Sequence, residues 1–331
     1  MSWIDEIRTA HILLTRKCNL RCEYCGIVRN IPPFLTKNLS LSFWERVVNH
    51  LFNLNPNVFP IFYGGEPLLS FDGKFSTFLK FVKFLNSTKN HYAIHSNSTL
   101  LSEEKIKNLA KVGLRNWTVS CDFTKNISGS IKKKEMAGLW ALEKFSKVSK
   151  NIELYLVITL TKYNIDNIEG AVESFGKRFW FEITLLDWKR NRFYDFSSFE
   201  NVTNLIPKIS KVKVLGRKLI RFKKEGFLIH NTDLWLKSMY KYVDSGFICK
   251  KPYYSLTIDS DGKLRLCYRI RGVRLPNFSI FDLPEKEKEI LKAYKEDLKM
   301  CCLGCNWDCQ FESEFAGQKV DWFSKLGGDR N

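Results

Sequence analysis

Three cysteines near the start of the chain, Cys18, Cys22 and Cys25, are the residues whose spacing most clearly indicates chemistry. Three residues separate the first pair and two separate the second, so a short loop can place three thiolates around one face of an iron-sulfur cubane. One iron would then lack a protein ligand. A structural zinc site is the alternative, but it takes four ligands in paired spacings, and no fourth Cys or His adjoins this loop. We therefore predict a [4Fe-4S] cluster with an open coordination position.

Segments with the periods of strands and helices alternate through the first two thirds of the chain, and they must position this loop. Strands are predicted over residues 10–15, 58–63, 92–96, 117–121, 153–159 and 179–185. Helices are predicted between them, over residues 41–54, 71–85, 102–113, 134–148 and 165–175. This alternation predicts a parallel sheet with helical crossovers, either open or curled into a partial barrel.

Polar and glycine-rich segments follow the predicted strands at their carboxyl ends. Cys18 comes after the first strand, residues 64–67 after the second, Asn97 after the third and Asp122 after the fourth. In parallel α/β folds the ligand site lies beyond the carboxyl ends of the strands. We therefore expect these four segments to meet on one rim.

The cysteine loop also carries a family resemblance. Three cysteines at this spacing, with the aromatic Tyr24 just before the last, resemble the signature of the radical S-adenosylmethionine (SAM) superfamily. The resemblance implies a partial (β/α)6 TIM-like barrel and a catalytic cluster on Cys18, Cys22 and Cys25. It implies that SAM chelates the open iron, with Tyr24 among the SAM-binding residues. An electron from the reduced cluster would then break the S–C5′ bond to give methionine and a 5′-deoxyadenosyl radical.

Two further motifs extend the resemblance, which covers about residues 8–187. The segment Gly64-Gly65-Glu66-Pro67 is similar to the family's GGEP loop, which implies contact with the methionyl amine of SAM. Glycines there allow a close approach of backbone to ligand. Asn97 is similar to an asparagine of the third strand that helps to bind SAM, and Ser98 stands where the family usually has glycine.

The fourth strand ends in Ser120-Cys121-Asp122, which resembles the family's Ser-x-Asp segment. The resemblance implies that Ser120 and Asp122 reach the ribose and carboxylate region of SAM. Phe123 stands where glycine is often found. Because side chains alternate along a strand, Cys121 points away from its neighbours, and we predict that it is a buried structural thiol.

A second group of cysteines lies in the last third of the chain. Cys249 and Cys267 flank a β-hairpin predicted over residues 253–268, whose turn is Asp259-Ser260-Asp261-Gly262. Helices are predicted over residues 233–243 and 285–298, and the second leads to Cys301, Cys302, Cys305 and Cys309. The arrangement resembles the auxiliary-cluster extensions called SPASM and twitch. This implies a small C-terminal extension, made of a hairpin and a helix, that binds a cluster.

Counting ligands indicates one auxiliary [4Fe-4S] cluster. Two would take about seven or eight thiolates, and only six cysteines follow Cys121. The expected ligands are Cys249, Cys267 and two of three C-terminal residues, Cys302, Cys305 and Cys309. Cys301 is not expected to be a ligand, because adjacent thiols on an extended segment point apart. Zinc is the alternative metal, since Cys302 and Cys305 also have the spacing of a zinc ribbon.

The charge of the chain is strongly basic and unevenly distributed, with a formal net charge of +18. Residues 201–224 hold eight basic residues and no acid: Lys208, Lys211, Lys213, Arg217, Lys218, Arg221, Lys223 and Lys224. One interpretation is a solvated face of a helix or strand. The other is a landing surface for an anionic partner: nucleic acid, a phosphorylated substrate, or an acidic electron donor such as ferredoxin or flavodoxin. We expect a core domain over residues 1–200, this basic connecting region over 201–245 and the SPASM/twitch-like domain over 246–331.

The N-terminus and the hydropathy of the chain predict a cytoplasmic protein without membrane insertion. The first residues lack the basic and apolar regions of a signal peptide, and no apolar run reaches the roughly 18 residues of a membrane helix. Ten cysteines in such a chain favour metal binding over disulfides.

The predicted function is hydrogen abstraction from a substrate by the deoxyadenosyl radical, with a peptide or natural-product precursor favoured over other small molecules by analogy. The alternative within catalysis is modification of RNA or a nucleotide, which the basic charge suggests. An alternative from another class is a non-catalytic metal-cluster protein that binds nucleic acid. That alternative gives no reason for the motifs at residues 64–67, Asn97, Ser120 and Asp122.

Overall fold

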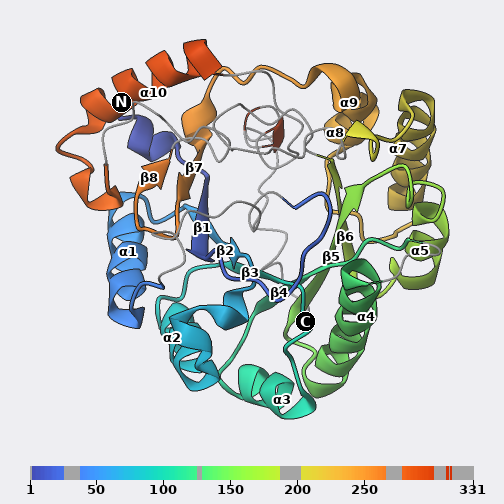
Figure 1. Cartoon of the computed structure of the whole chain (residues 1–331), viewed down its shortest axis with the longest axis horizontal. Helices are drawn as coiled ribbons and strands as arrows, with labels where there is room; N and C mark the ends of the chain where they lie inside the picture. Colours follow the sequence, from blue (N-terminus) through green and yellow to red (C-terminus); the bar gives the residue numbers. More distant parts are fainter. Residues whose placement is uncertain are drawn as a thin grey trace.

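The protein is built on one curled, mostly parallel sheet with helices around its outside (Figure 1). The computed structural model describes residues 2–25, 38–124, 129–186, 203–265, 278–301, 311–312 and 314. The strands are β1 (Thr9–Thr15), β2 (Phe59–Gly64), β3 (Ala93–Ser96), β4 (Asn116–Ser120), β5 (Glu153–Leu160), β6 (Trp180–Leu185), β7 (Ser255–Ile258) and β8 (Leu264–Arg265). The helices are α1 (Leu41–Leu54), α2 (Phe75–Ser87), α3 (Glu103–Lys111), α4 (Ser130–Val148), α5 (Ile168–Phe175), α7 (Ile209–Lys224), α8 (Asp233–Ser238), α9 (Tyr242–Ser245) and α10 (Glu287–Cys301).

The order of strands in the sheet is β6-β5-β4-β3-β2-β1-β7-β8, and each neighbouring pair from β6 to β7 is parallel. The helices of the first half connect successive strands, as right-handed crossovers between parallel neighbours require. The sheet curls but does not close, since β6 and β8 form its two edges. The prediction of an α/β fold with an open partial barrel is confirmed.

The two faces of the sheet have different environments. Side chains on the outer face, such as Ile12 and Trp117, are completely buried in the core beneath the helices. Cys121 belongs to this core and is completely buried, as the alternation of side chains predicts. The alternate positions face the inside of the curl, where Phe59, Ile61 and Ala93 form a separate small apolar cluster among polar neighbours.

Several helix boundaries differ from those predicted. Helix α2 begins at Phe75 and not at residue 71, because Asp72 and Gly73 have φ values of 55° and 72° that break helical geometry. Helix α4 begins four residues earlier than predicted, at Ser130, so that Lys134 lies one turn inside it. The predicted helix over 233–243 is instead divided into α8, a 3₁₀ turn and α9.

The predicted C-terminal hairpin is present as β7 and β8, which pair antiparallel around a turn in which Gly262 has a φ of 78°. Strand β7 also pairs in parallel with β1, so the hairpin extends the sheet of the core. The domain boundaries at residues 200 and 245 stay predictions. Cys267, Cys302, Cys305 and Cys309 lie outside the described residues.

A buried ion pair joins the hairpin to the end of β1. The guanidinium of Arg16 donates to both carboxylate oxygens of Asp259, each at 2.8 Å, and both side chains are 4% exposed. A buried ion pair with this two-point geometry is costly to break, because removal of one partner leaves the other charge uncompensated.

We therefore predict that Asp259→Asn lowers the free energy of unfolding by about 3–5 kcal/mol. The amide keeps the oxygen that accepts from the Ser260 N–H, but it removes the charge and places an NH2 donor where the second carboxylate oxygen accepted from Arg16. Urea unfolding measures the change. Asp166→Asn, which removes the solvent-exposed partner of Lys211, is the control and should cost less than about 1 kcal/mol. Equal losses in the two variants would contradict the assignment.

Candidate functional site

The cysteine loop follows β1 at the carboxyl rim of the sheet. Cys18, Cys22 and Cys25 are half-buried free thiols, and the Cys25 N–H donates to the Cys22 carbonyl at 3.0 Å. Cys18 interacts electrostatically with both other thiols. Burial raises the pKa of Cys18 to about 11 and also raises that of Cys22. A metal that binds these thiols must therefore displace their protons.

The glycine motif after β2 packs directly against this loop. The Gly65 N–H donates to the Thr15 carbonyl and the Glu66 N–H to the Lys17 carbonyl, each at 2.8 Å. A Cβ atom at Gly65 would lie 2.2 Å from the Lys17 carbonyl oxygen, and one at Gly64 would lie 2.3 Å from that of Thr15. Only glycine permits this approach, which ties the motif to the residue before Cys18.

Hydrogen bonds of Glu66 and Asn97 connect the segments that follow β1, β2 and β3. The carboxylate of Glu66 is completely buried and accepts from the Ser96 hydroxyl and the Asn97 N–H, both at 2.8 Å. Burial raises the pKa of Glu66 to about 7, and these hydrogen bonds oppose that rise. The Asn97 amide donates to the Cys18 sulfur at 3.7 Å and to the Asn19 side chain at 3.1 Å. The predicted site residues after β1, β2 and β3 are therefore in contact.

Asp122 lies just beyond β4 and makes contacts that the sequence did not reveal. The Tyr24 hydroxyl donates to its Oδ2 atom at 2.5 Å, and the Lys134 ammonium lies 2.6 Å from the same oxygen. Asp122 and Lys134 are 2% and 3% exposed. Tyr24 and Asp122 were predicted as site residues and are brought together, whereas Lys134 was missed. Ser120 ends β4, where it pairs with Val157 of β5.

The two positions where the family usually has glycine share one backbone feature. Ser98 has a φ of 60° and Phe123 a φ of 51°, in the left-handed region that favours glycine. The Ser98 hydroxyl accepts from the Trp117 indole at 3.1 Å, and the Phe123 ring stacks on Phe181 with 6.2 Å between centroids. These contacts offset the backbone strain, so the chain keeps the conformation without the glycine.

Comparison with known proteins decides the family. Residues 12–175 match the radical SAM superfamily. This part of the chain is a radical SAM domain. An uncharacterized protein of Methanocaldococcus jannaschii is 27% identical over 282 residues, which are 82% of this chain and 88% of that protein. The GTP 3′,8-cyclase of Parasynechococcus marenigrum is 32% identical over 123 residues, 35% of this chain and 34% of the cyclase.

Solved structures share the fold of this chain at low sequence identity. Streptococcus suis SuiB bound to its precursor peptide SuiA is 13% identical with a TM-score of 0.62, over 85% of this chain and 64% of SuiB. The chain thus spans less than two thirds of SuiB. The enzyme anSMEcpe, bound to SAM and the Cp18Cys peptide, is 17% identical with a TM-score of 0.59, over 95% of this chain and 86% of that one.

The radical SAM superfamily implies a [4Fe-4S] cluster and SAM, and the chemistry of the donors here fits that cluster. Three thiols lie in one loop, and an asparagine amide donates to one of them. The described residues contain no group of three or more His, Cys, Asp or Glu side chains arranged around a single ion. A cubane does not require such a group, because each thiolate binds a different iron.

Of the predicted auxiliary ligands, the described residues include only Cys249. This cysteine is partly buried and packs against the edge of the hydrophobic core. The auxiliary cluster and its ligand set therefore stay predictions.

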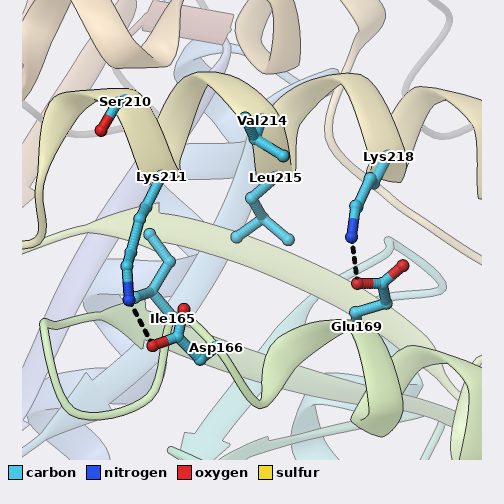
Figure 2. Close-up of a pocket in the computed structure, with 8 residues that line it drawn as sticks. All are labelled: Ile165, Asp166, Glu169, Ser210, Lys211, Val214, Leu215 and Lys218. Carbon is cyan, nitrogen blue, oxygen red and sulfur yellow. Dashed lines mark hydrogen bonds and ion pairs between the residues drawn. The ribbon is translucent and has the colours of Figure 1, made fainter.

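The basic stretch forms α7, and two of its lysines pair with acidic residues in and just before α5. Lys211 pairs with Asp166, and Lys218 pairs with Glu169. Figure 2 shows both pairs bridging a surface pocket, with Val214 and Leu215 between them. This pocket lies between helices on the outside of the barrel, away from the cysteine loop (Figure 1). We assign the pocket no part in the radical SAM site.

None of the helices in the described ranges is both long and apolar enough to cross a lipid bilayer.

The close contact at Gly65 leads to a second prediction. Gly65→Ala should lower the free energy of unfolding by about 1–3 kcal/mol, because the new methyl group overlaps the Lys17 carbonyl. It should also reduce the iron bound per chain after anaerobic reconstitution. Gly170→Ala in α5 is the matched control: a Cβ there meets no atom within 4 Å, so stability should stay equal or rise by up to about 1 kcal/mol. Full iron loading of Gly65→Ala would refute this role of the glycine.

Proposed function

We propose that this radical SAM enzyme holds a catalytic [4Fe-4S] cluster on Cys18, Cys22 and Cys25 and abstracts hydrogen from a peptide or natural-product substrate. The observation that carries the proposal is the contact of the cysteine loop with the ends of β2 and β3. The Glu66 N–H binds the carbonyl of Lys17, and the Asn97 amide donates to the Cys18 sulfur at 3.7 Å. The cluster, when reduced, supplies the electron that cleaves SAM to methionine and a 5′-deoxyadenosyl radical.

The protein's own residues position the reactants. The buried Glu66 carboxylate orients the Asn97 backbone, so that the segment after β3 is fixed beside the cysteine loop. We assign contacts with SAM to the residues around this junction: Tyr24, Gly64, Gly65, Glu66, Pro67, Asn97, Ser120 and Asp122. Their fixed geometry reduces the entropy that must be lost when the reacting groups meet.

The inside of the curled sheet is suited to protecting a radical. Three histidines lie there, and burial lowers the pKa of His11 to about 3 and those of His95 and His230 to about 4. All three are therefore neutral at pH 7. Their burial is consistent with an interior that excludes water, and exclusion of water limits side reactions of a reactive intermediate.

The substrate class rests on the structural neighbours. SuiB is bound to a precursor peptide and anSMEcpe to a peptide, and both share this fold. A second candidate, a nucleotide or other small molecule, is favoured by the similarity of about a third of the chain to a GTP 3′,8-cyclase. We rank the peptide first because the structural similarity to anSMEcpe covers nearly the whole chain.

We also propose an acidic electron donor such as ferredoxin or flavodoxin, in the cytoplasm. Lys213, Arg217 and Lys224 are exposed and have no acidic partner among the described residues. Their spacing of four and seven residues places them on one face of α7. An exposed row of cations attracts an acidic protein and accelerates its association.

The test of the catalytic proposal is the cleavage of SAM. Anaerobically reconstituted enzyme reduced with dithionite should form 5′-deoxyadenosine, and Cys22→Ala should form none because one iron loses its ligand. Cys121→Ala is the control, since that thiol lies in the hydrophobic core, and it should keep the activity. If the wild type carries a full cluster yet forms no 5′-deoxyadenosine, the proposal fails.

We propose one auxiliary [4Fe-4S] cluster on Cys249, Cys267 and two of Cys302, Cys305 and Cys309. Iron analysis should then give about eight irons per chain in the wild type and about four after replacement of Cys305 and Cys309 by alanine. Cys301→Ala should keep the wild-type content. One zinc and about four irons per chain in the wild type would instead indicate a zinc site.

A further inference from the structure

Lys134 is a fully buried ammonium group that neither the family resemblance nor the proposed chemistry explains. It lies one turn inside α4, and its side chain is 4% exposed. Burial of an ammonium is unfavourable unless the charge is compensated, and a helix can place a lysine in solvent at little cost. The two preceding residues, Lys132 and Lys133, are exposed in this way. The position of Lys134 therefore calls for a specific partner.

The partners are Asp122 and Tyr24, which meet the ammonium in a closed triangle. Lys134 Nζ lies 2.6 Å from Asp122 Oδ2 and donates to the Tyr24 hydroxyl at 2.5 Å, while that hydroxyl donates to Asp122 at 2.5 Å. The ammonium also lies 5.1 Å from the centre of the Tyr24 ring. Burial lowers the pKa of Lys134, but the Asp122 carboxylate and the other groups around the ammonium have a larger, opposite effect. The pKa of Lys134 is therefore raised well above its usual value. Lys134 thus stays a cation at neutral pH, held in its ion pair with Asp122.

This charge pair lies beside the cysteine loop. Tyr24 is between Cys22 and Cys25 in the sequence, so the triangle joins the loop to the end of β4 and to α4. Among the charges that act on the Cys22 thiol, the Lys134 ammonium has the largest effect, and Asp122 acts in the opposite direction. Both charges therefore lie within electrostatic range of the proposed cluster.

We propose that Lys134 and Asp122 are positioning residues that set the reduction potential of the N-terminal cluster through their opposed charges. The inference rests on the proposed function, because it requires the cluster on Cys18, Cys22 and Cys25. Reduction adds one electron to the cluster from an external donor and breaks no bond. A nearby cation stabilises the more negative reduced state and a nearby anion destabilises it, most strongly where water is excluded.

Three variants test the inference through the midpoint potential of the cluster, measured without SAM. Anaerobic redox titration with dithionite, followed by electron paramagnetic resonance, reports the first cluster as the signal that is absent from Cys22→Ala. Lys134→Met removes the cation and should shift the midpoint to more negative potential. Asp122→Asn removes the anion and should shift it to more positive potential. The double variant removes both charges and should lie between the two, near the wild type.

The matched control is Lys144→Met. Lys144 is on the same helix and forms an ion pair with Glu103, but the pair is partly exposed and is made with α3. Its removal should leave the midpoint unchanged. The control separates the effect of the buried pair from any general effect of removing a lysine from α4.

The opposite signs of the two shifts distinguish electrostatic tuning from a structural role, since loss of structure alone would move both single variants in the same direction. If Lys134→Met binds no cluster, the midpoint potential of Asp122→Asn is compared with that of the double variant. Equal midpoint potentials in these two variants overturn the inference. It also falls if all three variants lose the cluster while the wild type keeps it. Absence of the cluster from the wild type would instead count against the proposed function.

Discussion

The structure depends on the close approach of two backbone segments at the carboxyl rim of the sheet. The parallel pairing of β1 with β2 brings residues 64–66 against Thr15 and Lys17, and hydrogen bonds between backbone groups join them. Side chains are excluded from this contact, because a Cβ atom at Gly65 would lie 2.2 Å from a carbonyl oxygen. The cysteine loop can therefore be held at this rim because the adjacent glycine, Gly65, carries no side chain. Glu66, Asn97 and Cys18 are then placed by the same contact.

Much of this arrangement was predictable from sequence. The strands alternate with amphipathic helices, which favours a parallel sheet, and the functional residues follow the strands at the same end. The contacts of Glu66 were not predictable, since the motif implied contact with SAM whereas its carboxylate binds the end of β3. The positive φ of Ser98 and Phe123 was indicated only by the glycine that the family usually has at these positions, because neither residue type itself favours a left-handed conformation.

Charges were the hardest feature to interpret, because their meaning depends on partners distant in the chain. Lys134 belongs to a run of lysines that resembles a solvated helix face, and only the fold shows that it meets Asp122 and Tyr24 from two other elements. The basic run on α7 shows the reverse case. In the sequence Lys211 and Lys218 resemble residues available to an anionic partner, yet Asp166, just before α5, and Glu169, within it, already pair with them. A run of charged residues in the sequence thus shows neither whether their side chains are buried nor whether they are available to a binding partner.

The ion pair of Arg16 and Asp259 connects the two cysteine-bearing parts of the chain. Arg16 precedes Cys18 by two residues, and Asp259 lies in sequence between Cys249 and Cys267. Since β7 also pairs with β1, the hairpin is held to the cysteine loop by both a shared sheet and a buried charge pair. A flexible linker would let the distance between the two parts vary. Electron transfer or substrate binding between two metal sites requires a fixed distance, and this sheet extension supplies the rigid connection on which such a role would depend.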